Sequence, residues 1–181
     1  MSSPLDPRTA RLLAAPILLT LARLAAPGML LVVFQTAVSI TDTYFVGRLG
    51  TESLAGLALV FPLVMLLQMT SAGAMGGGVS SAVARALGAG DQRAARSLIA
   101  HATAIALGMG LAFTLLLLAL GPALYRLLGG KGDALVQALA YSNMLFAGSA
   151  LVWLANTFAS LLRGSGNMLV PALALIASTL A

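Results

Sequence analysis

Long apolar stretches without a charged residue alternate with short polar segments along the chain. Five stretches lack Asp, Glu, Lys and Arg, and they cover residues 24–41, 53–84, 97–125, 134–162 and 164–181. A hydrocarbon core of about 30 Å requires about 20 helical residues, so each stretch is long enough, or nearly so, to cross a membrane. The pattern predicts five transmembrane helices, at about 24–47, 53–84, 94–123, 134–162 and 167–181.

Three segments are not expected to form a straight transmembrane helix of ordinary length, namely the two ends of the chain and the second stretch. Residues 1–15 are polar and then amphipathic, which predicts a cytoplasmic N-terminal segment with an interfacial helix before the bundle of residues 16–181. The stretch 53–84 would reach about 48 Å as a straight helix, so we expect it to tilt, kink or project from the membrane. Because residues 176–181 are still apolar, we expect a chain truncated relative to the working protein.

Composition excludes the main alternatives to a membrane protein. The 181 residues are 60% hydrophobic and 8% charged, with a mean hydropathy of +1.00. A soluble domain carries roughly 25% charged residues, and disordered chains are poor in apolar residues. The absence of cysteine excludes disulfides, thiolate catalysis and Cys-based metal sites. The fold class is therefore an all-α polytopic membrane protein.

The basic residues predict the orientation of the helices. The net charge of +5 comes from residues scattered between apolar blocks, which is typical of topology signals and not of a nucleic-acid-binding face. With the N-terminus inside, the inner segments hold seven Lys or Arg residues and the outer segments hold three. We therefore expect a multi-pass protein of the plasma membrane (the bacterial inner membrane) with a cytoplasmic N-terminus. Tyr44 and Tyr125 fall near the outer ends, as interfacial rings would.

Asp42 is the one acidic residue set within a predicted span. An ionisable group at such a position is costly and by default marks an ion or substrate pathway. Gln35 and Ser39 precede it by seven and three residues, so the three side chains share one helical face. We interpret Asp42 as an ion-coupling residue and Gln35 and Ser39 as residues lining a cavity.

Two further predicted helices carry polar stripes. Asn156 lies between two serines of the fourth span, and Gln68 follows Phe61 and Met65 on the second. Polar stripes on several apolar helices are expected around a wet central cavity, and we assign these four residues to its lining. The alternative stays open that the amides only join helices by hydrogen bonds and that Phe61 and Met65 only pack.

Backbone-altering residues suggest moving parts and close contacts. Pro27–Gly28 lies early in the first span and predicts a hinge, because proline removes a helical hydrogen bond; a static kink is the alternative. Glycines at 73, 76, 77 and 78 would let another backbone approach closely.

An enzymatic interpretation has little support in the sequence. A lone histidine without partners makes no metal site, so His101 predicts none. A hydrolase dyad of His101 with Ser80 or Ser81 is the only catalytic arrangement available. We therefore expect neither an enzyme nor a cofactor.

Three motifs then give the sequence a family resemblance. Pro27–Gly28 with Asp42-Thr43-Tyr44-Phe45-Val46-Gly47-Arg48 resembles the first helix and outer turn of multidrug and toxic compound extrusion (MATE) transporters. The stretch Arg85-Ala86-Leu87-Gly88-Ala89-Gly90-Asp91 resembles the family's loop between helices two and three, and Arg163-Gly164-Ser165-Gly166-Asn167 resembles its loop into helix five.

The resemblance implies most of the first six-helix lobe of a two-lobed, twelve-helix antiporter. Such a protein exports organic, often cationic, compounds from the cell in exchange for H⁺ or Na⁺, and Asp42 matches the family's coupling acid. Its partners are then small cationic substrates, the lipid bilayer and a second lobe that is missing here. Two alternatives remain: a half-transporter fragment that does not transport, and a flippase for a lipid-linked precursor. The flippase would need cationic cavity residues, which the predicted spans lack.

Overall fold

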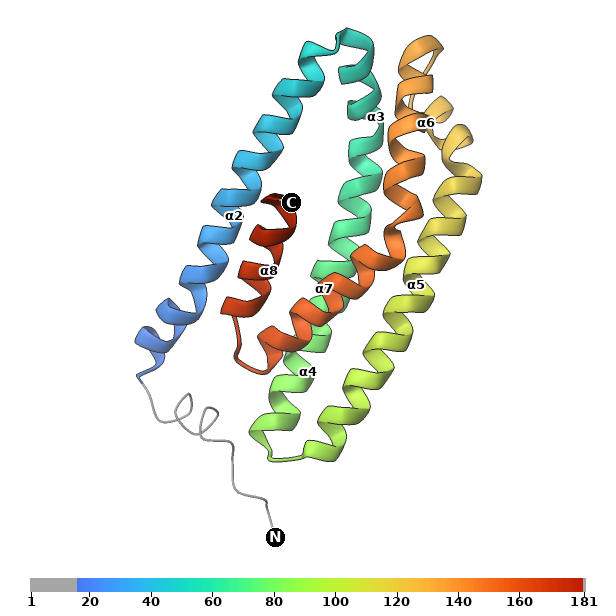
Figure 1. Ribbon diagram of the computed structural model, residues 1–181. Coiled ribbons are helices and arrows are strands. Elements are labelled where there is room, and N and C mark those ends of the chain that lie inside the picture. The colour runs from blue at the N-terminus through green and yellow to red at the C-terminus, as the bar shows by residue number, and fades with distance from the viewer. Residues whose placement is uncertain (1–15, 181) are drawn as a thin grey trace.

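The computed structural model describes residues 16–180, and this part of the chain is helical without a strand (Figure 1). The expected all-α fold is thus confirmed, while the predicted interfacial helix at residues 1–15 lies outside the described residues. One segment is a π-helix, labelled η1, and the others are α-helices. In chain order they are α2 (Ile17–Arg48), α3 (Thr51–Gln68), η1 (Met69–Met75), α4 (Gly76–Gly88), α5 (Gln92–Leu127), α6 (Gly132–Ala147), α7 (Ser149–Gly164) and α8 (Leu169–Leu180).

The helices run up and down between two ends of the molecule. The α2–α3 and α5–α6 turns lie at one end, and the α4–α5 and α7–α8 turns lie at the other (Figure 1). The helix α7 packs against α4 and α5, α3 packs against α6, and α2 contacts α3 and α8. Short turns between antiparallel neighbours are what the alternation of apolar and polar segments predicts.

The turn between α4 and α5 shows how local chemistry ends one helix and begins the next. Gly90 has a φ of 73°, a left-handed conformation that glycine adopts without steric cost. The Asp91 carboxylate then accepts a hydrogen bond of 2.8 Å from the N–H of Ala94, which caps α5. Gly88 has no such conformation and is the last helical residue of α4.

Three continuous helices are long and apolar enough to cross a membrane, namely residues 28–48, 51–88 and 92–127. The α6–α7 pair makes a fourth span if the two helices cross together. The described part of the expected fifth span is α8, which has 12 residues. The helix α2 begins at Ile17, before the expected start of the first span at residue 24, because residues 17–22 are mostly apolar and a single charge at Arg23 does not end a helix.

The long second stretch contains a change of helix type. Between α3 and α4, the seven residues of η1 are π-helical, and the N–H of Gly76 donates to the carbonyl of Ser71, five residues back. The hydroxyls of Thr70 and Ser71 donate to the carbonyls of Leu66 and Leu67 at 2.7 Å, which supplies donors where the backbone pattern changes. Short π-helical segments occur frequently at functional sites.

The fourth expected span is bent. The axes of α6 and α7 meet at 50° around Gly148. Next to the bend, the Thr114 hydroxyl of α5 donates to the carbonyl of Phe146 at 2.9 Å. An uncharged run does not predict such a bend, because its apolar residues suit a straight and a bent helix equally.

The buried core joins α3, α5, α6 and α7. Its largest members include Phe146, Trp153 and Tyr125, and the rings of Trp153 and Phe113 lie 5.6 Å apart. Burial of Tyr125 contradicts its expected place at the membrane interface, since the ring is fully enclosed. Tyr44 is 60% exposed and lies under the Arg48 guanidinium, 5.9 Å from it.

Candidate functional site

A hydrogen-bonded amide pair joins α3 to α7. The Asn156 Nδ2 donates to Gln68 Oε1 at 3.2 Å and to Ser71 Oγ at 2.9 Å. Gln68 ends α3, Ser71 lies in η1, and Asn156 lies in the middle of α7. Ser71 is fully buried, whereas Gln68 is exposed. The structure thus brings together two of the predicted cavity residues from positions far apart in the chain, and it adds Ser71 as their shared partner.

The polar contacts continue along α7 toward the end of the molecule that holds the α7–α8 turn. Ser160 Oγ donates to the carbonyl of Asn156 at 2.7 Å and accepts a bond of 2.7 Å from the Arg163 guanidinium. Gly76, the first residue of α4, lies so close that a Cβ there would be 2.6 Å from Ser160 Oγ. Gly73, Gly77 and Gly78 have open space instead, so only one of the four glycines lies against a neighbouring helix, and it meets a side chain there and not the expected backbone.

Phe61 and Met65 lie on the same face of α3 as Gln68, at spacings of seven and three residues from it. Both are exposed, Phe61 at 54% and Met65 at 39%. An aromatic ring and a thioether therefore extend the apolar surface next to the amide pair.

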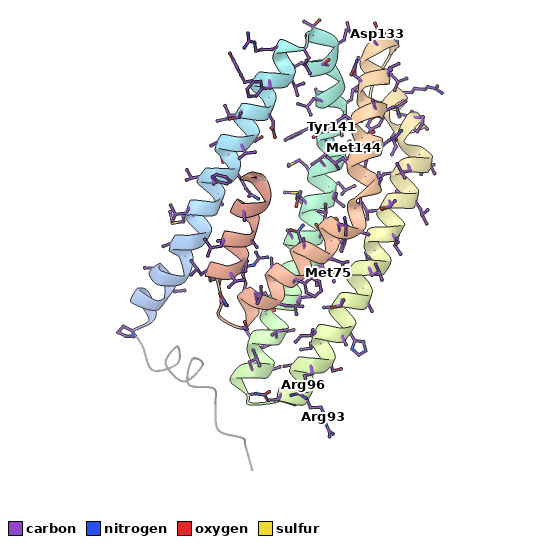
Figure 2. All side chains as sticks on the ribbon, viewed as in Figure 1. Met75, Arg93, Arg96, Asp133, Tyr141 and Met144 are labelled. Carbon is purple, nitrogen blue, oxygen red and sulfur yellow. The ribbon has the colours of Figure 1, made fainter. Side chains whose placement is uncertain are left out.

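Asp42, Gln35 and Ser39 lie on α2 and are exposed. Asp42 lies close enough to Tyr141 of α6 to interact with it electrostatically. Tyr141 is placed on the half of the bundle that also holds the α2–α3 turn (Figure 2). Sequence reasoning missed Tyr141, and a tyrosine inside an apolar run was its only signal. The structure records no hydrogen bond between these three α2 residues and the amide pair in residues 16–180.

The predicted hinge lies within an uninterrupted helix, because α2 continues from Ile17 through Pro27 and Gly28 to Arg48. A Cβ at Gly28 would meet no atom within 4 Å. This part of α2 therefore has free space around it, and its role as a hinge stays a prediction.

The residues of the hydrolase dyad are not arranged for catalysis. His101 Nδ1 lies 2.7 Å from the carbonyl oxygen of Ser97 on its own helix, and Ser81 Oγ donates to the carbonyl of Gly78. No hydrogen bond joins His101 to Ser80 or Ser81 in the described residues. His101 instead borders an apolar cavity of about 220 Å³ between α4 and α5, which none of the predicted cavity residues lines. Over the described part of the chain, no three His, Asp or Glu residues gather as metal ligands would.

The helices are apolar and long enough to cross a membrane, and polar side chains of α3, η1 and α7 bond to one another. These features define a polytopic helical membrane protein with a polar contact between its helices. A family model described as MatE matches residues 27–181, and the chain therefore belongs to the MATE family. The resemblance of the three sequence motifs is thus confirmed.

Individual relatives agree with this assignment. The chain is 30% identical over 168 residues to a protein of Shewanella oneidensis named "FAD transporter", matching 90% of this chain and 36% of that protein. It is 29% identical over 153 residues to the "Probable multidrug resistance protein NorM" of Thermotoga maritima, matching 83% of this chain and 32% of the relative.

A solved structure matches the fold as well. The structure of a MOP superfamily transporter from Pyrococcus furiosus aligns with a TM-score of 0.90 and 32% identity, covering 98% of this chain and 39% of the other. The chain thus spans between about a third and two fifths of the length of these relatives.

Proposed function

We propose that the chain forms the first lobe of a cation-coupled antiporter that exports organic, cationic compounds across the plasma membrane. The observation that carries this proposal is the MATE fold, matched at a TM-score of 0.90, with a carboxylate on α2 at Asp42. The relative from Thermotoga maritima, named as a probable multidrug resistance protein, supports the choice of cargo. The working transporter would then combine this lobe with a second one.

Asp42 is the coupling group in this mechanism. It takes up H⁺ or helps to bind Na⁺, and no salt bridge neutralises it within residues 16–180. Loss of its negative charge weakens the attraction for a cationic cargo and favours another bend of α2 at Pro27–Gly28. Two states biased by one charge are sufficient for alternating access. Gln35, Ser39, Phe61, Met65, Gln68 and Asn156 contact the cargo.

The test compares efflux of ethidium, a cationic dye, with and without the Asp42 charge. The chain is expressed alone and together with the second lobe of the Thermotoga maritima relative, and efflux is driven by an imposed pH or Na⁺ gradient. We expect gradient-dependent efflux from the two lobes together and its loss in Asp42→Asn. Asp133→Asn, at the start of α6, is the matched control and should retain efflux. Gradient-dependent efflux by Asp42→Asn would refute the role of Asp42.

The same experiment tests the half-transporter alternative, since a chain that never supports efflux in either combination is a non-transporting fragment. A second cargo class is a flavin nucleotide, which the name of the Shewanella oneidensis relative favours. The flippase alternative is disfavoured because Arg163, the one basic residue of α7, donates to Ser160 near the end of that helix and not beside the amide pair.

A further inference from the structure

In the amide pair of Gln68 and Asn156, the positions of the donor and acceptor atoms are fixed. Ser71 determines them. A serine hydroxyl has one proton, and that of Ser71 is donated to the carbonyl of Leu67 at 2.7 Å. Toward Asn156, Ser71 Oγ is therefore an acceptor, which turns the NH₂ group of Asn156 toward it at 2.9 Å. Burial of Ser71 keeps water from replacing either bond.

The second proton of Asn156 Nδ2 is donated to Gln68 Oε1 at 3.2 Å, so both donor positions of the Asn156 amide are used. Two amide groups then remain without a hydrogen-bond partner among the described residues: Asn156 Oδ1, which accepts, and Gln68 Nε2, which donates. The acceptor belongs to Asn156 and the donor to Gln68, and these two side chains are bonded directly to each other. A ligand that satisfies both must itself carry a donor and an acceptor.

We propose that Ser71 is a positioning residue that makes this face specific for ligands with a lactam or imide edge, in which an N–H adjoins a C=O. The ligand N–H donates to Asn156 Oδ1, and its C=O accepts from Gln68 Nε2. An ammonium group carries donors only and a phosphate acceptors only, so each would leave one amide group unpaired.

The surroundings of the pair suit a flat ring. Phe61 and Met65 are exposed on the same face of α3 and precede Gln68, so they lie toward the end of α3 that follows α2. A heterocycle whose polar edge meets the amides extends its π-face over an aromatic ring and a thioether, both of which contact rings favourably. This inference rests on the proposed function only in treating the face of Gln68 and Asn156 as the one that meets the cargo.

The test measures binding and requires no transport. Purified protein in lipid nanodiscs is titrated against lumiflavin, a fluorescent ring with an imide N–H, and against 3-methyllumiflavin, which lacks that donor. We expect lumiflavin to bind about tenfold more tightly, as expected for one unpaired acceptor. In Ser71→Ala, Asn156 is free to turn, and the preference should fall toward equal affinity.

Three further variants make the result specific. Ser71→Cys preserves the size of the side chain with a weak donor and should lose the preference even if Ser71→Ala fails to fold. Gln68→Met, an exposed change, removes the donor to the ligand C=O, which both rings carry, and should therefore weaken the binding of both rings while leaving the preference in place. Ser81→Ala is the matched control, because its hydroxyl donates to Gly78 on its own helix, and it should retain the preference.

Equal affinity of the unchanged protein for the two rings, or no binding of either, would overturn the proposed edge recognition. A preference that survives both Ser71 variants would overturn the role of Ser71. These results are independent of ethidium efflux, so a protein that discriminates between the rings without exporting dye contradicts the proposed function and leaves this inference intact.

Discussion

Single hydroxyl groups connect the helices of this bundle at places where the backbone departs from a regular helix. Ser71, in the π-helical segment, accepts a hydrogen bond from Asn156 of α7, and Thr114 of α5 donates to the carbonyl of Phe146 at the α6–α7 bend. Most other described threonine hydroxyls bond only to the preceding turn of their own helix, as Thr103 does to Ile99. In an apolar medium, a free carbonyl is costly, so a hydroxyl from a neighbouring helix stabilises the irregular backbone.

Removal of the Thr114 hydroxyl should therefore destabilise the bundle. We expect Thr114→Val to lower the free energy of unfolding by about 1–2 kcal/mol, because the carbonyl of Phe146 loses its interhelical donor. Thr103→Val, on the same helix, loses only a bond within its own helix and should change stability by less than about 0.5 kcal/mol. Unfolding in detergent, followed by circular dichroism, measures both. Equal losses in the two variants would contradict a special role for Thr114.

At the scale of the elements, α5 and α7 pack closely because of one glycine. A Cβ at Gly110 would lie 2.5 Å from Ala150 Cα and 3.2 Å from its nitrogen, which are backbone atoms that cannot rotate away. Gly108, on the same helix, has no atom within 4 Å of such a Cβ. Gly110 is therefore packed against a neighbouring helix and Gly108 is not, so the two positions can be compared directly by substitution.

Alanine at these two positions should have opposite effects. We expect Gly110→Ala to destabilise the protein by about 1–3 kcal/mol through forced separation of α5 from α7. Gly108→Ala should be neutral or stabilising by up to about 1 kcal/mol, since alanine is the better helix former. Thermal unfolding midpoints in detergent give the comparison. A Gly110→Ala protein as stable as Gly108→Ala would show that the helices separate without cost.

The pattern of apolar runs predicts where the helices lie but not how they are interrupted or paired. Absence of charge marks residues 53–84 as a long helix, yet it predicts neither the change to a π-helix nor the bond between Ser71 and Asn156, which lies 85 residues away. Gly148, at the bend, is one of 19 glycines and has no distinguishing neighbour in the sequence. The pairing of Gln68 with Asn156 likewise depends on the packing of η1 and α4 against α7.

At the scale of the whole molecule, the charged residues gather at two ends separated by apolar helices. Figure 2 places Arg93 and Arg96 at one end and Asp133 at the other. Arg85 and Arg163 lie in the last turns of α4 and α7, at the same end of the molecule as Arg93. The positive-inside rule then predicts that this end faces the cytoplasm.

The absence of cysteine allows this orientation to be measured directly. Single cysteines at Glu52 and Asp133, both exposed, report on one end, and cysteines at Gln92 and Ser165, also exposed, report on the other. We expect a membrane-impermeant maleimide to label positions 52 and 133 in intact cells and positions 92 and 165 only in inverted vesicles. The reason is that Lys and Arg residues resist translocation, so loops rich in them stay inside. The cysteine-free protein controls for background, and the opposite labelling pattern would place the N-terminal end of α2 outside the cell and require Asp42 to face the cytoplasmic half of the membrane.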